Sequence, residues 1–401
     1  MLDVADALAE ILARVRPLAP GAARLGPGAL GRVLADDVRA DQDSPPFPKS
    51  LRDGYAVRSA DCSLPNRELR VTSEVAAGVV PTKAVAPGEC ARIFTGAPMP
   101  DGADAVVMQE DTQPAGDGAV RITDDRVKPG QWVFARGTEM RAGDVVLAAG
   151  AALTPAALGV LAGLGLVEAK LHPAPRVFVL PTGNELVEPG HPLKPGQIRN
   201  SNGPMLAAQV QRAGGVATHR GIGPDTLPEL LKLVGDELDG TDVLLVAGGV
   251  SVGKYDLVPA VLAELGVATH VRQVRMKPGK PLLFGTRGGT LVFGLPGNPV
   301  SAAVCFELFV RPALRVLAGH PDPGPTTVTL PLAEPIAEAN DRPTYRPAKL
   351  EVGPTGYAVR PRPWHGAPDL RGLAAADALL VLPAGEARLD PGSLAQVVLI
   401  N

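Results

Sequence analysis

The sequence predicts a multidomain α/β and β protein, in which a domain with a parallel sheet is joined to β-rich domains. Three observations predict this class. Strand-like and helix-like segments alternate from residue 174 to about 320, short strand-like runs broken by glycine and proline fill 41–144, and short strands and turns follow from 321 to 401. A chain of 401 residues is long enough for roughly two to four domains.

Two further helices are expected outside these regions. In the N-terminal segment MLDVADALAEILARV, apolar residues recur on one helical face, and acidic residues within the pattern argue against a signal peptide. A second helix is expected within 145–170, with Thr154 as its N-cap and Pro155 at its first position. The helical part of this most apolar stretch is too short to span a bilayer.

The region 41–144 is predicted to be a β-rich module. The segments ELRVTSEV, ECARIFTG, DAVVMQED and AVRITD have the composition of strands, and glycine and proline separate them. Two turn-like motifs lie between the strands. KSLRDGYAV contains an Asp-Gly step, which by itself is typical of a hairpin turn, and IFTGAPMPDGADAVV has Thr95 at its centre.

In the α/β region, three expected strands end in glycine-containing loops: PTGNEL (181–186), AGGVSVGKYD (247–256) and GLPGNP (294–299). Ligands of open parallel sheets bind in the crevice at the carboxyl ends of the strands. Each loop alone is typical of an ordinary βα turn, but three at one end of a sheet predict a binding crevice.

The GLPGNP loop is expected to open a helix that runs through NPVSAAVCFELFVRPALRVLAG. Asn298 is predicted as the N-cap and Pro299 as the first helical residue. Gly294 and Gly297 are expected to allow close approach of the backbone to a ligand, with Ser301 beside them. The start of this helix would then bind an anion.

Composition excludes several classes of protein. A formal net charge of −3 argues against nucleic acid as the main partner. Cys62, Cys90 and Cys305 are far apart and form no C-x-x-C pair, and the six histidines show no zinc-ligand spacing. We therefore expect a cytoplasmic protein without disulfides.

Charged residues beside the loops favour a site for a phosphate-bearing substrate and Mg²⁺. Lys277 and Lys280 lie three residues apart in MKPGKP, either as a solvated surface pair or around an anion. Carboxylates on or beside glycine-rich loops supply the hard oxygen ligands that Mg²⁺ prefers: Asp53, Glu139, Glu185, Asp225 and Asp256. Taken alone, Asp256 is equally typical of a helix cap.

Six ordered motifs resemble one family. PPFPKSLRDGYAV, IFTGAPMPDGADAVVMQED, PTGNELVEPGHPLKPGQIRNSNGPML, AGGVSVGKYD, MKPGKP and GLPGNPVSA are similar to the motifs of the molybdopterin molybdenumtransferases of the bacterial MoeA type, which are related to the E domain of gephyrin. The resemblance implies an elongated four-domain chain. Its domains would be 1–40 plus 145–173 (linker and dimerisation), 41–144 (β-rich), 174–320 (molybdopterin-binding α/β) and 321–401 (C-terminal β).

The resemblance also implies the reaction and the assembly. A homodimer would form an active cleft between the α/β domain of one chain and the second domain of the other. There, molybdate would be inserted into adenylylated molybdopterin with the help of Mg²⁺, releasing AMP. A molybdopterin-adenylating partner would act upstream.

The family's functional positions map onto this sequence by motif. The implied catalytic residues are Asp53, Thr95, Glu139, Glu185, Asp225 and Asp256, of which Glu185, Asp225 and Asp256 would bind the metal. The implied substrate and oxyanion contacts are Gly248, Gly249, Ser251, Lys277, Lys280, Pro296, Gly297, Asn298, Pro299 and Ser301.

The sequence departs from the family pattern at three positions. Glu139 and Asn184 stand where an aspartate is common, and Ala367 stands where relatives carry a serine. Arg342 and Arg346 are candidates to compensate for the missing hydroxyl. The alternative functions are a scaffold that keeps the fold without the transfer activity, and a nucleotide-processing enzyme that shares the α/β domain alone.

Overall fold

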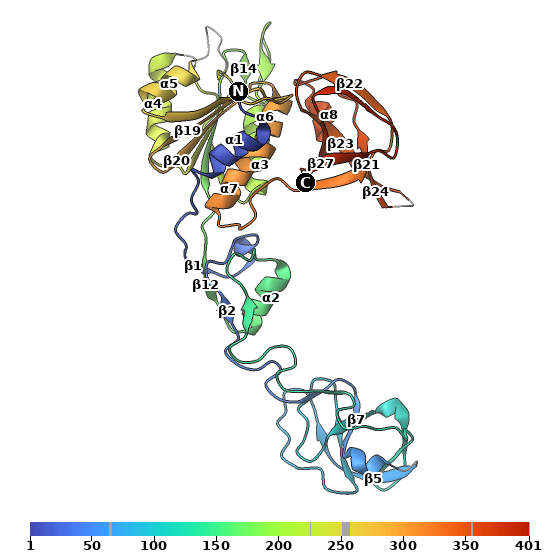
Figure 1. Ribbon diagram of the computed structural model, residues 1–401. Coiled ribbons are helices and arrows are strands. Elements are labelled where there is room, and N and C mark those ends of the chain that lie inside the picture. The colour runs from blue at the N-terminus through green and yellow to red at the C-terminus, as the bar shows by residue number, and fades with distance from the viewer. Residues whose placement is uncertain (64–65, 225, 251–256, 354–355, 401) are drawn as a thin grey trace. The chain divides into compact units, whose positions relative to one another are not determined.

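The computed structural model describes residues 1–63, 66–224, 226–250, 257–353 and 356–400 of the chain (Figure 1). These residues fall into two units. The first contains Met1–Asp36, Gly150–Gly159 and Leu166–Asn401, and the second contains Asp37–Ala149 and Val160–Gly165. No helix among the described residues is long and apolar enough to cross a membrane.

The core of the first unit is a six-stranded mixed sheet. Its strand order is β16 (Val216–His219), β13 (Arg176–Pro181), β17 (Val243–Ala247), β20 (Thr290–Leu295), β19 (Pro281–Arg287) and β18 (Ala268–Gln273). The first four strands are parallel; the sequence pattern predicts three of them, β13, β17 and β20, but not β16. β19 is antiparallel to both of its neighbours, β20 and β18, and the pattern did not predict these last two strands. β19 and β20 form a hairpin through Gly288 and Gly289, and a two-residue connection can join only antiparallel strands.

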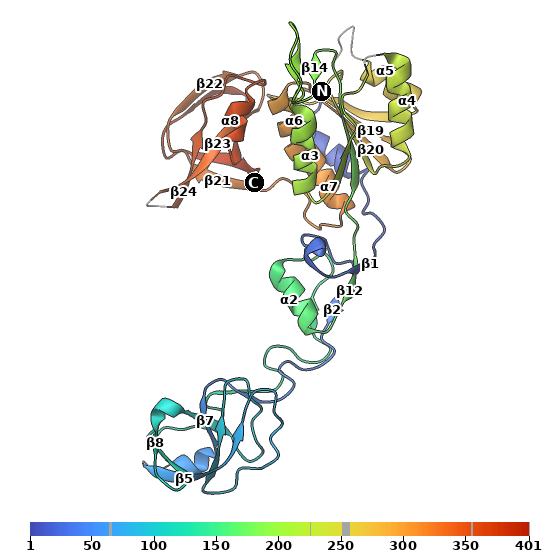
Figure 2. The same ribbon diagram turned by 180° about the vertical axis from the view of Figure 1, so that it is seen from behind.

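Helices cover both faces of this sheet (Figures 1 and 2). Helices α4 (Leu227–Leu238) and α5 (Val258–Glu264) lie on one face, and α1 (Val4–Leu12), α3 (Asn202–Arg212), α6 (Pro299–Cys305) and α7 (Arg311–Leu317) lie on the other. The strand side chains alternate between the two cores. In β17, Val243 and Leu245 pack with the α1 face, whereas Leu244 and Val246 pack with the α4 face.

The long helix expected after GLPGNP contains an irregular turn. Helix α6 is followed by one π-helical segment, Phe306–Val310, and then by α7. Pro312 is at the start of α7, where it has no N–H to donate to the preceding turn. A widened helical turn just before a proline accommodates this missing hydrogen bond.

The C-terminal part of the first unit is a small β-domain. Its main sheet has the order β21 (Thr327–Pro331), β27 (Leu394–Leu399), β25 (Ala378–Leu382), β23 (Thr344–Gly353) and β24 (Gly356–Pro361), and β22 (Ile336–Asn340) pairs with β26 (Gly385–Leu389). The sequence pattern predicts strands and turns alone here, but a short helix, α8 (Leu370–Ala374), is also present. It begins at Asp369 because that carboxylate accepts the N–H of Gly372, at 3.2 Å.

The remaining segments lie where the chain passes between the two units, and helix α2 has residues in both. Strand β1 (Gly21–Arg24) pairs with β12 (Glu168–Leu171). Helix α2 (Pro155–Gly163) begins at the predicted proline, and Thr154 Oγ1 accepts the N–H of Ala157 at 3.1 Å. The predicted cap is therefore confirmed.

The second unit is built on a six-stranded sheet. Its order is β7 (Ala105–Met108), β4 (Gly54–Val57), β6 (Glu89–Ile93), β5 (Arg67–Val75), β9 (Ala119–Ile122) and β8 (Thr112–Pro114). Two separate two-stranded sheets are also present: β3 (Lys49–Ser50) with β10 (Val133–Phe134), and β2 (Val38–Arg39) with β11 (Val145–Leu147). All four segments predicted as strands in this region are strands.

Candidate functional site

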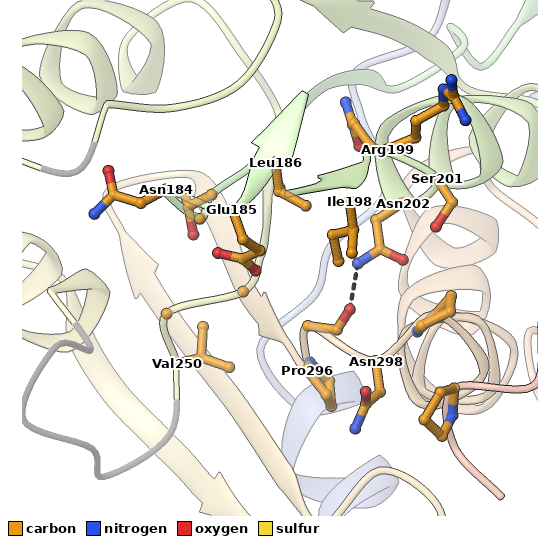
Figure 3. Close-up of a pocket in the computed structure, with 18 of the residues that line it drawn as sticks. Asn184, Glu185, Leu186, Ile198, Arg199, Ser201, Asn202, Val250, Pro296 and Asn298 are labelled. Atoms are coloured by element: carbon orange, nitrogen blue, oxygen red, sulfur yellow. Dashed lines mark hydrogen bonds between the residues drawn. The ribbon is translucent and has the colours of Figure 1, made fainter. Parts of the chain in front are cut away.

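The three glycine-containing loops of the α/β sheet surround a pocket of about 920 Å³, at the carboxyl ends of β13, β17 and β20 (Figure 3). The predicted crevice is therefore present. It brings together seven of the predicted site residues: Glu185, Gly248, Gly249, Pro296, Gly297, Asn298 and Pro299. The volume lies within the roughly 300–1,000 Å³ that is usual for small-molecule sites.

One wall of the pocket is glycine backbone packed against Thr182. Gly248 has φ +100°, and a Cβ atom there would lie 2.4 Å from the carbonyl oxygen of Thr182. Thr182 Oγ1 is buried and has no hydrogen-bond partner among the described residues. A buried hydroxyl without a partner costs free energy, so its presence in a pocket wall favours a polar ligand or water nearby.

Gly294 has a different role from the one expected. A Cβ atom at this position would lie 2.8 Å from Val250 Cγ1 and 3.1 Å from Leu283 Cβ. The glycine is therefore required by packing inside the sheet layer. Gly297, by contrast, lines the pocket, and its nearest neighbour would be Gly248 Cα at 3.7 Å.

Asn298 occupies the predicted N-cap position of α6, but its side chain makes no capping hydrogen bond. The helix start offers few free donors to an anion. Pro299 has no N–H, and the N–H of Val300 donates to the carbonyl oxygen of Ala367 at 3.1 Å. Ser301 is 4% exposed and is not among the residues that line the pocket. The helix start therefore contributes its proline and asparagine rather than a set of amide donors.

The opposite wall comes from the segment that opens α3, which the sequence analysis did not single out. Asn200 Oδ1 accepts the N–H of Gly203 at 3.0 Å, and its Nδ2 donates to Glu188 Oε1 at 3.1 Å. Asn202 Nδ2 donates to the carbonyl oxygen of Gly297 at 2.7 Å and so joins this wall to the GLPGNP loop (Figure 3). The sequence feature that could have predicted this wall is the presence of two asparagines at the start of a helix.

Among the described lining residues, the charged ones are Glu185 and Arg199. Both are exposed. A Cβ atom at Gly183 would lie 2.6 Å from Glu185 Oε2, so this carboxylate rests against backbone that has no side chain. Arg199 forms no ion pair with any residue that the structure describes, and its side chain extends away from Pro296 and Asn298 (Figure 3). In the sequence, the one feature that could have indicated Arg199 as a site residue is its position directly before Asn200 and Asn202.

Of the three predicted metal ligands, the structure describes Glu185, whereas Asp225 and Asp256 lie outside the described residues. Ser251, a predicted substrate contact, lies outside them as well. Within the described ranges, no cluster of three or more metal-ligating side chains is found.

Lys277 and Lys280 do not line the pocket, and both are exposed. Their turn is nevertheless held firmly. The backbone of Lys277 bonds to the C-terminal β-domain, since its N–H donates to Pro343 O at 2.8 Å and its carbonyl accepts the Tyr345 N–H at 2.7 Å. Beneath the turn, Cys305 Sγ contacts the Gly279 carbonyl oxygen at 3.5 Å.

In the second unit, the two turn-like motifs meet at Asp53. Its Oδ1 accepts both the N–H and the hydroxyl of Thr95, at 2.7 and 2.8 Å. These two hydrogen bonds, the backbone one first, lower the pKa of the Asp53 carboxyl. The Asp-Gly step is not a hairpin turn: Gly54 begins β4, and a Cβ atom there would lie 1.9 Å from Val107 O.

Glu139 also lies in the second unit, where its Oε2 accepts the hydroxyl of Ser44 at 2.6 Å. The two arginines considered as replacements for the missing serine are already engaged. Arg342 pairs with Asp341 at 2.6 Å, and Arg346 pairs with Glu338.

Comparison with known proteins identifies three regions of the chain. Residues 2–165 match a family model described as MoeA N-terminal region (domain I and II), 178–316 match a probable molybdopterin binding domain, and 329–400 match the MoeA C-terminal region (domain IV).

Two curated relatives named molybdopterin molybdenumtransferase cover most of the chain. The one from Nostoc sp. is 38% identical, over 91% of this chain and 85% of its own. The one from Staphylococcus aureus is 34% identical, over 92% and 89%. A crystal structure described as molybdopterin biosynthesis moeA protein from Pyrococcus horikoshii OT3 matches with a TM-score of 0.84 and 28% identity, and covers 100% of both chains.

Proposed function

The chain belongs to the MoeA family of molybdopterin molybdenumtransferases, and we propose that it inserts molybdate into adenylylated molybdopterin and releases AMP. Its place in molybdenum cofactor biosynthesis follows from the family. The observation that carries the proposal is the 920 Å³ pocket at the carboxyl ends of β13, β17 and β20, inside the region that matches the molybdopterin-binding model. Its Gly-rich and Asn-rich walls suit a polar, anionic ligand.

We propose two tasks for the charged residues at and near the pocket: carboxylates hold Mg²⁺, and lysines attract the anionic oxygens. Glu185, with Asp225 and Asp256, would hold Mg²⁺. An exposed carboxylate at the pocket fits that ion, which proteins usually bind through one or two carboxylates and substrate phosphates. When bound, Mg²⁺ would neutralise charge on the phosphate groups. Lys277 and Lys280, held on a fixed turn, would attract molybdate or phosphate oxygens as point charges.

The second unit is proposed to serve the same reaction in a homodimer, with the active cleft shared between chains. Asp53 is kept ionised by its two hydrogen bonds from Thr95, so it presents a fixed negative charge rather than a proton. Glu139 would add a second carboxylate. We further propose a cytoplasmic enzyme that receives its substrate from a molybdopterin-adenylating protein.

The transfer reaction is tested by mixing purified protein with adenylylated molybdopterin, Mg²⁺ and molybdate and measuring AMP. We expect AMP to be released on addition of molybdate and not before. Omission of Mg²⁺ should slow the release. If molybdate produces no AMP, the proposed reaction is wrong.

The role of the pocket carboxylate is tested with Glu185→Gln. This change keeps the size of the side chain and removes its charge, so we expect AMP release to fall by a factor of 10² or more, by analogy with loss of one electrostatic contact in a transition state. The matched control is Glu264→Gln, an exposed glutamate of α5 that does not line the pocket. Equal rates in the two variants would exclude Glu185 from the reaction.

A further inference from the structure

The turn that leads into β4 holds an arginine, Arg52, directly before Asp53. Ser50, which is 1% exposed, binds both backbone groups of Arg52: its hydroxyl donates to Arg52 O at 2.6 Å and accepts the Arg52 N–H at 3.2 Å. Within the same turn, the N–H of Leu51 donates to Trp132 O at 2.9 Å. The backbone of the turn is therefore held by hydrogen bonds, although Arg52 itself is exposed.

The guanidinium of Arg52 is stacked rather than paired. Its Cζ lies 4.6 Å from the centroid of the Trp132 ring. It forms no ion pair or side-chain hydrogen bond with any residue that the structure describes, and this includes its neighbour Asp53. A stacked guanidinium keeps its in-plane N–H groups free, and this planar set of donors matches two oxygens of one phosphate group. The charges of Arg52 and Asp53 both remain available to a ligand.

Trp132 supports Arg52 from an unusual backbone conformation. Its φ is +53°, in the left-handed region that a bulky side chain rarely adopts. Strained backbone of this kind is concentrated at functional sites, where the surrounding structure holds it in place. The arrangement is repeated on the same short sheet, since Lys49 Nζ lies 5.4 Å from the centroid of the Phe134 ring and has no ion-pair partner within the described ranges. Two uncompensated cations thus lie on two aromatic rings.

Another stacked arginine of the second unit shows what is different about Arg52. Arg92 Cζ lies 5.4 Å from the centroid of the Phe94 ring, but Arg92 Nε also pairs with Glu74 at 3.8 Å. The charge of Arg92 is therefore compensated within the protein. Arg52 has no such carboxylate, so it gains more than Arg92 does from an anion that arrives from outside.

We propose that Arg52, stacked on Trp132, binds a phosphate group of the adenylylated substrate. The inference rests on the proposed function, because it assigns Arg52 to the same cleft that Asp53 would serve in the homodimer. Arg52 contacts the substrate in this role, whereas Trp132 and Ser50 are positioning residues that act through it. Molybdate presents similar oxygens, so the experiment separates the two sources of the oxyanion.

The test measures AMP release by the full chain while adenylylated molybdopterin and molybdate are varied in turn. We expect Arg52→Gln to raise KM for adenylylated molybdopterin about tenfold, the size of one charge-assisted hydrogen bond, with kcat and KM for molybdate unchanged. Arg52→Lys keeps the charge and loses the planar donors, so its KM should lie between the two. The control is Arg92→Gln, which removes the compensated arginine and should leave both KM values unchanged.

The role of Trp132 is tested with Trp132→Leu and with a double variant. Because Trp132 acts through Arg52, Trp132→Leu should raise the same KM, and Arg52→Gln combined with Trp132→Leu should bind no more weakly than Arg52→Gln alone. Titration calorimetry with adenylylated molybdopterin in the absence of molybdate gives the affinities independently of turnover. Trp132→Phe keeps an aromatic face and should retain most of the affinity. Thermal melts check that each variant is folded.

Three results would overturn the inference: equal affinity of Arg52→Gln and Arg92→Gln for adenylylated molybdopterin, a raised KM for molybdate alone, or additive losses in the double variant. Failure of the proposed function is distinguishable. A chain that binds adenylylated molybdopterin through Arg52 but releases no AMP would contradict the reaction and keep the contact. Release of AMP by Arg52→Gln with an unchanged KM would contradict the contact and keep the reaction.

Discussion

At the residue scale, the hydrogen bonds between Asp53 and Thr95 join two motifs that have no evident connection in the sequence. Each motif alone is typical of a turn, and 42 residues separate the two side chains along the chain. In the fold, one carboxylate oxygen accepts two hydrogen bonds from one threonine. The sequence indicated both residues through a family resemblance, but their contact depends on how β4 and β6 pair, which no local pattern specifies.

We predict that Thr95→Val raises the pKa of Asp53 toward the ordinary aspartate range. The backbone N–H of residue 95 remains as a donor, so the pKa should stay below that range. A lowered carboxyl pKa stabilises the fold above the ordinary range, and this stability is lost as pH falls through the lowered value. In the variant this loss should be smaller in total and should be complete at a higher pH. Carboxyl ¹³C shifts measured against pH give the value directly.

The control for this titration is Thr138→Val, whose hydroxyl donates to Ala135 O and does not touch Asp53. It should leave the Asp53 titration unchanged. A midpoint that is the same in Thr95→Val and in the unmodified protein would show that the hydroxyl does not act on this carboxyl.

Gly294 illustrates why a glycine in a loop motif is ambiguous at the residue scale. Its absence of a side chain can serve a ligand, a positive φ or a tight packing contact, and the sequence does not distinguish these. Here the contacts with Val250 and Leu283 require it. Gly248, in the neighbouring loop, has a positive φ and a close contact with Thr182, and it also lines the pocket.

At the scale of elements, the π-helical segment Phe306–Val310 joins two walls of the pocket region. It carries Glu307, which is 3% exposed. This carboxylate accepts from Gln209 Nε2 at 2.7 Å, from Arg212 and from Arg311 at 3.2 Å. Gln209 and Arg212 belong to α3, whose first residues line the pocket, and α6 begins at the opposite wall. The buried carboxylate therefore fixes the spacing of α3 and α6.

We predict that Glu307→Ala lowers the free energy of unfolding of the first unit by about 1–2 kcal/mol, the usual cost of leaving buried hydrogen-bond partners unsatisfied. The cost stays below that of a fully buried ion pair, because the arginines left behind, Arg212 and Arg311, are 44% and 23% exposed and can be solvated. Urea denaturation followed by circular dichroism measures the change. Glu264→Ala, at an exposed position of α5, is the control and should stay within about 0.5 kcal/mol of the unmodified protein. Similar values for the two variants would mean that Glu307 does not tie the helices together.

The elements that could be predicted are those with strong local signals. The parallel strands β13, β17 and β20, the proline-initiated α2 and the predicted strands of region 41–144 follow from apolar runs and turn residues. The antiparallel strands β18 and β19 could not be recognised, because their pairing depends on a short hairpin inside an otherwise alternating pattern. Helix α8 was missed because five residues are too few for a helical period. The α3 wall was missed because its asparagines act through tertiary contacts.

At the scale of the whole molecule, each unit has its own buried core. The clusters around Cys62 and Cys90, and around Ala56 and Val75, contain residues of the second unit, and the cluster around Cys305 contains residues of the first. Units with separate cores and limited connecting backbone can unfold separately. The chain passes from the first unit to the second after Asp36, returns at Gly150, and contributes Val160–Gly165 to the second unit before the first resumes at Leu166. Unfolding of one unit therefore leaves the core contacts of the other in place.

We predict that the reactivity of the three free thiols shows the two units unfolding independently. Burial raises the pKa of Cys62 to about 11 and of Cys90 to about 12, and it also raises the pKa of Cys305. Because the thiolate is the reactive form, all three should be nearly inert to an aromatic disulfide at pH 8 in the folded protein.

With increasing urea, Cys62 and Cys90 should become reactive together, and Cys305 should follow a separate curve. That curve should be steeper, since the first unit is larger and exposes more surface on unfolding. Mass spectrometry of labelled peptides assigns each thiol. A common midpoint and slope for all three would show instead that the two units unfold as one cooperative body.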